Sequence, residues 1–190
     1  STASTFLATS PFFDASKVTI TAGTVTSVGK ANSVAAQNIA VNVSNQILGG
    51  YTTNFQGEAV SVQSSAFTIA TTSGFTGNGV ITGIAIYDEN GAIVAGPIDE
   101  ASTCTTGCTI TFTDTITYPT GTHTYTLKGK IPSGVASNST VIVTTNPSTL
   151  WTSVTGQTTG NTISLSTAGS FDMNTMTVKA ASLAITVSAN

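Results

Sequence analysis

The sequence predicts an all-β protein, an antiparallel β-sandwich, and three observations support this prediction. Apolar and polar residues alternate with a period of two along most of the chain, which is the pattern of half-buried strands. Turn-forming residues such as Gly, Asn-Gly and Asn-Pro interrupt this alternation about every 8–15 residues. Threonine and valine, which pack well on a pleated surface, are abundant in the alternating segments. Many short strands separated by regular turns favour a sandwich over a helical fold.

The clearest element is a hairpin near the middle of the chain. Residues 80–87 and 92–95 both alternate, and the turn at residues 88–91 ends in Asn-Gly, whose members tolerate the positive φ of a tight hairpin turn. No segment has a convincing helical pattern, although residues 32–38 and 45–50 leave that alternative open. We predict the remaining strands, in chain order, at residues 17–22, 24–29, 36–43, 58–71, 109–117, 123–130, 140–144, 150–155, 161–166, 173–178 and 182–187.

The composition is poor in charge and rich in hydroxyl groups. Roughly a third of the residues are Ser or Thr, whereas 13 of 190 are charged and none is Arg. An ordinary soluble domain carries about a quarter charged residues. The few lysines form no basic stripe, so we expect no nucleic-acid partner. No apolar run reaches the roughly 18 residues needed to span a bilayer, so we expect no membrane insertion.

The N-terminal segment, residues 1–13, is predicted to be an extended strand that is separate from a single sandwich domain at residues 14–190. No linker or repeat divides the longer part. In a strand, the apolar side chains of the segment would lie on two faces: Phe6, Ala8 and Phe12 on one, and Leu7 and Phe13 on the other. Burying each large apolar side chain contributes about 1.5–3 kcal/mol, so these residues need a partner surface. Pro11 suits an edge or the end of a strand, because it lacks one ladder donor.

Two interpretations of this segment remain open. It is either the first strand of its own sandwich, or a donor strand that adds to a neighbouring copy through main-chain hydrogen bonds. Residues 59–87 contain no charge at all, whereas open sheet edges are normally protected by charges or prolines. Unprotected edges favour polymerisation, and a head-to-tail contact that does not close generates a filament. Glycans could cover the same edges.

The cysteines and the glycosylation motifs indicate an exported protein. Cys104 and Cys108 are predicted to form a disulfide, with a reduced pair as the alternative, since a metal site would need further ligands. Asn42 and Asn138 stand in N-x-[ST] motifs and are candidate glycosylation acceptors. The chain starts without a hydrophobic leader, so we expect that a signal peptide has been removed and that the protein is secreted.

No catalytic or metal-binding set can be assembled, and we predict no enzyme activity, cofactor or metal. The single histidine, His123, has no nearby nucleophile in the sequence that it could activate. Five carboxylates near the hairpin are interpreted as turn acids, with a Ca²⁺ site as the alternative: Asp88, Glu89, Asp99, Glu100 and Asp114. The ingredients of a Lys–Asn amide cross-link would be Lys17, Lys30 or Lys128 with Glu58 as the assisting acid, and a surface salt bridge is the alternative. Trp151 is the only tryptophan, so surfaces on which a sugar could stack are scarce.

Residues 84–97 and 121–132 resemble strand pairs in the Ig-like β-sandwich modules of prokaryotic surface proteins, and residues 179–187 are similar to the closing strand of such a module. The resemblance implies an Ig-like or jelly-roll-type sandwich in an S-layer-like protein, an adhesin or a donor-strand, pilin-like filament, and it transfers no functional residue. Our leading hypothesis is a secreted subunit that polymerises with copies of itself into a pilus-like fibre. The alternative is an adhesin or S-layer module that does not polymerise and recognises a surface or a glycan.

Overall fold

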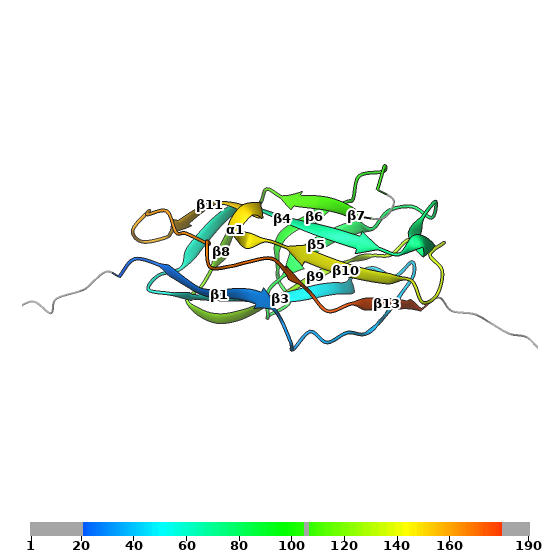
Figure 1. The fold of residues 1–190 in the computed structure, drawn as a ribbon, viewed down its shortest axis with the longest axis horizontal. Helices are drawn as coiled ribbons and strands as arrows, with labels where there is room; N and C mark the ends of the chain where they lie inside the picture. Colours follow the sequence, from blue (N-terminus) through cyan, green and yellow to red (C-terminus); the bar gives the residue numbers. More distant parts are fainter. Residues whose placement is uncertain (1–20, 105–106, 180–190) are drawn as a thin grey trace, which may run out of the picture.

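The computed structural model describes residues 21–104 and 107–179, and it confirms the predicted all-β sandwich (Figure 1). The predicted donor strand, residues 1–13, and the predicted strand at residues 182–187 lie outside the described residues. Two sheets pack face to face around one apolar core. Only one full helical turn, α1 (Pro147–Leu150), and one 3-10 turn, η1 (Ser73–Phe75), occur in the described part.

The first sheet is antiparallel throughout. Its strands lie in the order β1 (Thr24–Lys30), β3 (Gln46–Gln56), β9 (Gly121–Lys130), β5 (Thr82–Tyr87) and β6 (Ile93–Ile98). The hairpin predicted around Asn-Gly is β5–β6. Asp88 accepts hydrogen bonds from the backbone N–H groups of Asn90 and Ala92 at 3.0 and 2.8 Å and so closes the turn between these strands.

The second sheet is built around the long strand β4 (Val60–Thr71). β11 (Trp151–Gly156) and β10 (Thr140–Thr145) pair with it antiparallel, as do β7 (Gly107–Phe112) and β8 (Ile116–Tyr118). β12 (Phe171–Asp172) and β13 (Met176–Lys179) extend the sheet beyond β10. β2 (Asn38–Ala40) then pairs with β13 in parallel, which departs from the fully antiparallel sandwich that the sequence predicts.

Strand β3 is the main element that the sequence analysis missed. The sequence analysis left a helix open at residues 45–50. In the structure, Gly49 and Gly50 lie inside a buried strand between β1 and β9. A Cβ on Gly49 would lie 2.6 Å from the Met173 sulfur, and one on Gly50 would lie 2.5 Å from Cγ2 of Val34. The glycines are therefore required by close packing against β3 and do not mark a turn.

Other boundaries differ from the prediction for local reasons. Residues 161–166 form no strand, because only Thr162 makes a bridge, to Thr155, although Ile163 and Leu165 are buried. The strand predicted at residues 109–117 divides into β7 and β8, and Asp114 lies in the break. The predicted strand at 36–43 shrinks to β2, and the strand predicted at 173–178 starts only at Met176, as β13. The short strand β12 precedes it, and residues 32–38 are not helical.

A cluster of aromatic rings fills the centre of the sandwich. The Tyr118 ring stacks on Trp151 at 5.5 Å between centroids and meets Tyr125 edge-on at 4.9 Å. The hydroxyl groups of Tyr51 and Tyr118 form a hydrogen bond of 2.9 Å in the buried core. The Trp151 indole N–H donates to Oγ1 of Thr145 at 3.2 Å, so Trp151 is part of the core and offers no exposed stacking surface. Such rings contribute both buried area and geometric specificity.

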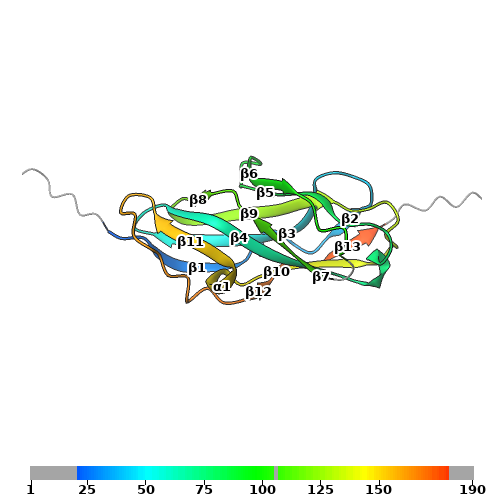
Figure 2. The same cartoon turned by 90° about the horizontal axis from the view of Figure 1, so that it is seen from above.

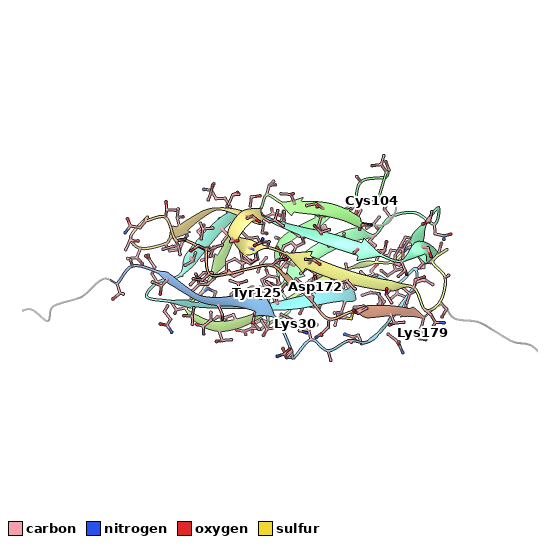
Figure 3. The ribbon with its side chains drawn as sticks, in the orientation of Figure 1. Lys30, Cys104, Tyr125, Asp172 and Lys179 are labelled. Atoms are coloured by element: carbon pink, nitrogen blue, oxygen red, sulfur yellow. A yellow bond between two sulfur atoms is a disulfide. The ribbon has the colours of Figure 1, made fainter. Side chains whose placement is uncertain are left out.

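The described chain begins and ends at opposite ends of an elongated body. β1 starts at one end, and β13 finishes at the other, in both views (Figures 1 and 2). We refer to these as the β1 end and the β13 end. Gly23 and Glu58 lie at the β1 end, since Thr24 is paired with Gln56. Lys179, paired with Ala40, marks the β13 end (Figure 3).

The buried Tyr51–Tyr118 pair gives a test of the core. Tyr51→Phe leaves the Tyr118 hydroxyl buried without its partner, so we expect the free energy of unfolding to fall by about 1–3 kcal/mol. Tyr118→Phe should behave alike, whereas the double variant should lose clearly less than the sum, because it leaves neither hydroxyl unpaired. Denaturant unfolding of the four proteins measures this coupling, and strictly additive losses would contradict it.

Candidate functional site

At the β1 end, Glu58 ties three segments together. Its carboxylate accepts hydrogen bonds from the backbone N–H of Gly23 at 2.9 Å and from those of Thr158 and Thr159 at 2.6 and 2.9 Å. The Thr159 hydroxyl donates a further bond at 2.6 Å. Gly156 leaves the space that this arrangement needs, because a Cβ there would collide with the carboxylate. Glu58 therefore joins Gly23, just before β1, to the loop that follows β11.

The bonds to Glu58 favour its ionised form. The Thr159 hydroxyl and backbone N–H, followed by the N–H groups of Gly23 and Thr158, outweigh the desolvation of the carboxylate and lower its pKa from 4.5 to about 2. Backbone and hydroxyl donors therefore favour the charged carboxylate without an ion pair to any described residue. The sequence analysis singled out Glu58 as an assisting acid for a cross-link, whereas its oxygens bind backbone donors here.

Towards the β13 end, the first sheet carries a groove of about 470 Å³ on its outer side, which we call the Tyr87 groove. Lys130 ends β9 and pairs with Thr82 at the start of β5, and Asn42 donates its N–H to the carbonyl of Ile131. These contacts bring the β9 and β5 ends beside the loop that leads from β2 to β3. The groove is lined by Ser44, Asn45, Thr82, Gly83, Ala85, Tyr87, Ile93, Pro97, Asp99 and Lys130.

Hydrogen bonds and a cation–π contact hold the walls of the Tyr87 groove. The Tyr87 hydroxyl donates to Oδ1 of Asn45 at 3.0 Å, and the Lys128 ammonium lies 4.3 Å from the centre of the Tyr87 ring. Asp99 accepts from the backbone N–H of Gly83 at 2.6 Å. The sequence analysis did not predict this groove, because the loop and the hairpin that form it are far apart in the chain.

The two large apolar side chains that stand out on the surface of the described part both belong to this region. Ile93 is 52% exposed and lines the Tyr87 groove, and Val43 is 49% exposed and precedes Ser44 in its wall. The other large apolar side chains of the described residues are buried or partly buried. An apolar patch on an otherwise hydroxyl-rich surface is typical of an interaction site.

His123 lies beside a second hollow of about 350 Å³, lined also by Asp88, Glu89 and Tyr125. Its Nδ1 is 2.9 Å from a Glu89 carboxylate oxygen, and its Nε2 is 3.0 Å from the carbonyl oxygen of Thr120. The Thr120 carbonyl and an ionised Glu89 are both acceptors, so the geometry favours the doubly protonated ring of His123. The hydrogen bond to Glu89 accordingly raises the pKa of His123. In that state the ring has no free lone pair with which to act as a base.

The other carboxylates proposed for the hairpin region also bind backbone donors. Asp99 and Asp114 each accept one backbone N–H, from Gly83 and Gly96, and so join segments 16 and 18 residues apart, whereas Asp88 bonds within its own turn. Within residues 21–104 and 107–179, no three His, Cys, Asp or Glu side chains come close enough together to hold a metal ion. The Ca²⁺ alternative therefore gains no support from their arrangement.

Cys104, in a loop that projects from the sandwich (Figure 3), is joined by a disulfide to Cys108 in β7, as predicted. Glu100 lies below this loop and is buried, and one oxygen accepts the Ile81 N–H at 2.8 Å. Desolvation by burial raises the pKa of Glu100 above 4.5, and the single bond from Ile81 offsets this only in part. Glu100 and Glu58 are thus shifted in opposite directions.

The candidate glycosylation acceptors are both exposed and lie near the β13 end. Asn42 follows β2, and Asn138 donates its backbone N–H to the carbonyl of Val178 at 2.8 Å. The Asn138 side-chain oxygen also accepts a hydrogen bond from the Lys179 ammonium, a contact that the sequence analysis did not predict.

The proposed cross-link ingredients are not brought together in the described residues. Lys128 lies over Tyr87, Lys30 is exposed at the end of β1, and Glu58 is engaged by backbone donors. Lys17 lies outside the described residues. The structure therefore offers no Lys–Asn–acid arrangement among the residues named for it.

Comparison with known proteins assigns no family: no protein-family model matches this chain, and no curated protein matches it. In the described ranges, no helix has both the length and the apolar character that crossing a membrane requires.

The Glu58 pKa predicts acid sensitivity. A carboxyl with a folded-state pKa lower than its unfolded value stabilises the fold above pH 4.5, and this stabilisation is lost as the pH falls towards about 2. Glu58→Gln should therefore be less stable than the wild type at pH 7 and should lose less stability between pH 4.5 and 2. Denaturant unfolding at a series of pH values measures both effects. Asp172→Asn is the control, because Asp172 is exposed and accepts a hydrogen bond only from the Thr144 hydroxyl. Equal pH dependences of Glu58→Gln and the wild type would contradict the prediction.

For Glu100 we expect the opposite dependence of stability on pH. Its folded-state pKa lies above 4.5, so the folded state binds the proton more tightly, and the buried charge destabilises the protein as the pH rises past that value. Glu100→Gln keeps an acceptor for the Ile81 N–H without the charge. We expect it to be more stable than the wild type at pH 7 and no more stable at pH 3, in the same unfolding series. A loss of stability at pH 7 would refute this assignment.

Proposed function

We propose that this protein is a secreted structural subunit that assembles into an extracellular filament. In this proposal, residues 1–13 of one copy add as a β-strand to the next copy and complete a contact between sandwiches. The proposal assigns the chain no catalytic role. The fully engaged ring of His123 is consistent with that.

The observation that carries the proposal is the placement of the two chain ends. The described chain starts at the β1 end and finishes at the β13 end of the long axis (Figures 1 and 2). A segment leaving the β1 end meets the β13 end of a neighbour when copies are stacked head to tail. The surfaces in such a contact are different, so the contact repeats without closing and produces a fibre. Glu58 supports this arrangement, because its hydrogen bond holds Gly23 at the β1 end, on the N-terminal side of β1.

The apolar character of the N-terminal segment is a second support. Its side chains Phe6, Leu7, Phe12 and Phe13 need a partner surface, and in this proposal another copy supplies it. The hydroxyl-rich composition and the disulfide are compatible with an exported protein, and exposed Asn42 and Asn138 are available for glycans.

A second candidate function rests on the Tyr87 groove. A concave surface with one aromatic ring, apolar walls and several polar groups also suits a small ligand, as in an adhesin module that recognises a surface glycan. In that case the protein would bind its target as a monomer. The state of assembly therefore separates the two candidates.

Removal of the N-terminal segment tests the proposal. We expect the full chain to form filaments that are visible by negative-stain electron microscopy and to sediment as a polymer. A chain lacking residues 1–13 should remain monomeric and keep the circular dichroism and thermal midpoint of a folded sandwich, because in this proposal the segment packs against the neighbouring copy.

A matched control replaces only polar residues of the segment, Thr5 and Thr9, with serine, and it should assemble normally. Filaments from the truncated chain, or a full chain that stays monomeric at all concentrations, would contradict the proposal. A monomeric full chain that binds glycans would favour the second candidate.

A further inference from the structure

We propose that the Tyr87 groove is the acceptor for Phe12, Phe13 and Asp14 of a second copy of this chain. This inference rests on the proposed function and adds the docking site to it. The occupant is a defined segment whose chemistry complements the groove in three ways: apolar contact, reach and charge.

The apolar match concerns Ile93 and Val43. They are the two strongly exposed large apolar side chains of the described part; Ile93 lines the Tyr87 groove, and Val43 directly precedes the lining residue Ser44 in the chain. Ala85, Tyr87 and Pro97 add further apolar surface to the lining. Its volume of about 470 Å³ is within the range of pockets that bury a ligand with a few rings. Two adjacent phenylalanines provide rings of this kind, and Pro11 before them ends the preceding strand.

The length of the chain before β1 lets Phe12 and Phe13 reach the β13 end of the neighbouring copy. From Asp14 to Thr21 an extended chain covers at most about 25 Å. When copies are stacked head to tail, the residues closest to the donor body therefore bind the acceptor near the junction, at its β13 end. The Tyr87 groove includes Lys130 and Thr82 at that end. Residues 1–10 remain to form a strand further along the acceptor.

The charge match concerns Lys130 and Asp14. Among the described residues, the only pair of opposite charges within 4.0 Å is His123 with Glu89, so Lys130 has no carboxylate partner there. Asp99, the acidic residue of the groove, is engaged by the Gly83 N–H. Asp14 is the first charged side chain of the sequence and directly follows Phe13. It therefore supplies a carboxylate partner for Lys130, next to the apolar anchor.

The free edge of β6 explains why the contact uses side chains at this place. Pro97 has no N–H, and the Gly96 N–H is already bonded to Asp114 at 2.8 Å. These features protect the edge against strand pairing. A segment arriving at the Tyr87 groove consequently binds through its phenylalanine rings and its carboxylate, and the β-ladder forms with another part of the neighbour.

A charge swap tests the inference in the full chain. Lys130→Asp and Asp14→Lys should each raise the critical concentration for filament formation about threefold to tenfold, measured by sedimentation. The double variant should return it close to the wild-type value. Lys30→Asp changes an exposed lysine outside the groove and is the control, with an unchanged critical concentration. Ile93→Asp should raise the critical concentration at least tenfold while the thermal midpoint stays near that of the wild type.

A photo-cross-linking amino acid at position 93 identifies the occupant directly. In filaments grown from mixed ¹⁵N-labelled and unlabelled chains, we expect cross-links to residues 11–14 that join labelled to unlabelled chains. Cross-links confined to a single chain would overturn the inference, as would cross-links to another segment or filaments indifferent to all the groove variants. The proposed function would survive those results. A full chain that forms no filaments would overturn both.

Discussion

The fold depends on carboxylates that bind backbone N–H groups in a chain with very little charge. Among the described residues, five acids do this, at the places where strands end, turn or break: Glu58, Asp88, Asp99, Glu100 and Asp114. A charged acceptor forms a stronger bond to a peptide N–H than a hydroxyl does. The numerous Ser and Thr residues wet the surface, while the few acids hold the irregular segments. Glu58 is the most important of them, because it joins the start of the described chain to a loop more than 100 residues further on.

The sequence predicted the class of fold because period-two alternation and turn residues are local signals. The β5–β6 hairpin, β9 and β10 follow that pattern closely. Strand β3 escaped prediction because Gly49 and Gly50 are dictated by Met173 and Val34, residues that contact them only in the folded protein. The strand predicted at residues 161–166 was wrong for the opposite reason. Ile163 and Leu165 alternate with polar residues and are buried, but the segment forms only an isolated bridge and no β-ladder.

The candidate sites were less predictable than the fold. The pairing of Cys104 with Cys108 followed from their spacing, and Glu58 was noticed as a lone acid, although not for its backbone bonds. The Tyr87 groove needed the three-dimensional arrangement, since it joins the loop after β2 to β5, β6 and the end of β9. The two ends of the sandwich therefore have different characters. At the β1 end, the buried Glu58 carboxylate joins separate segments through hydrogen bonds. Towards the β13 end, the Tyr87 groove has an apolar surface and Lys130, which has no carboxylate partner among the described residues.

The placement of the first and last described strands also governs how the molecule would respond to tension. A pull applied between Gly23 and Lys179 acts along the long axis, parallel to β1 and β13 (Figure 1). Interstrand hydrogen bonds lie across that direction, so those joining β1 to β3 and β13 to β10 bear the load together in shear. Unzipping them one at a time would require a force perpendicular to the strands. The topology thus orients the hydrogen bonds of the sandwich to oppose stretching along its long axis.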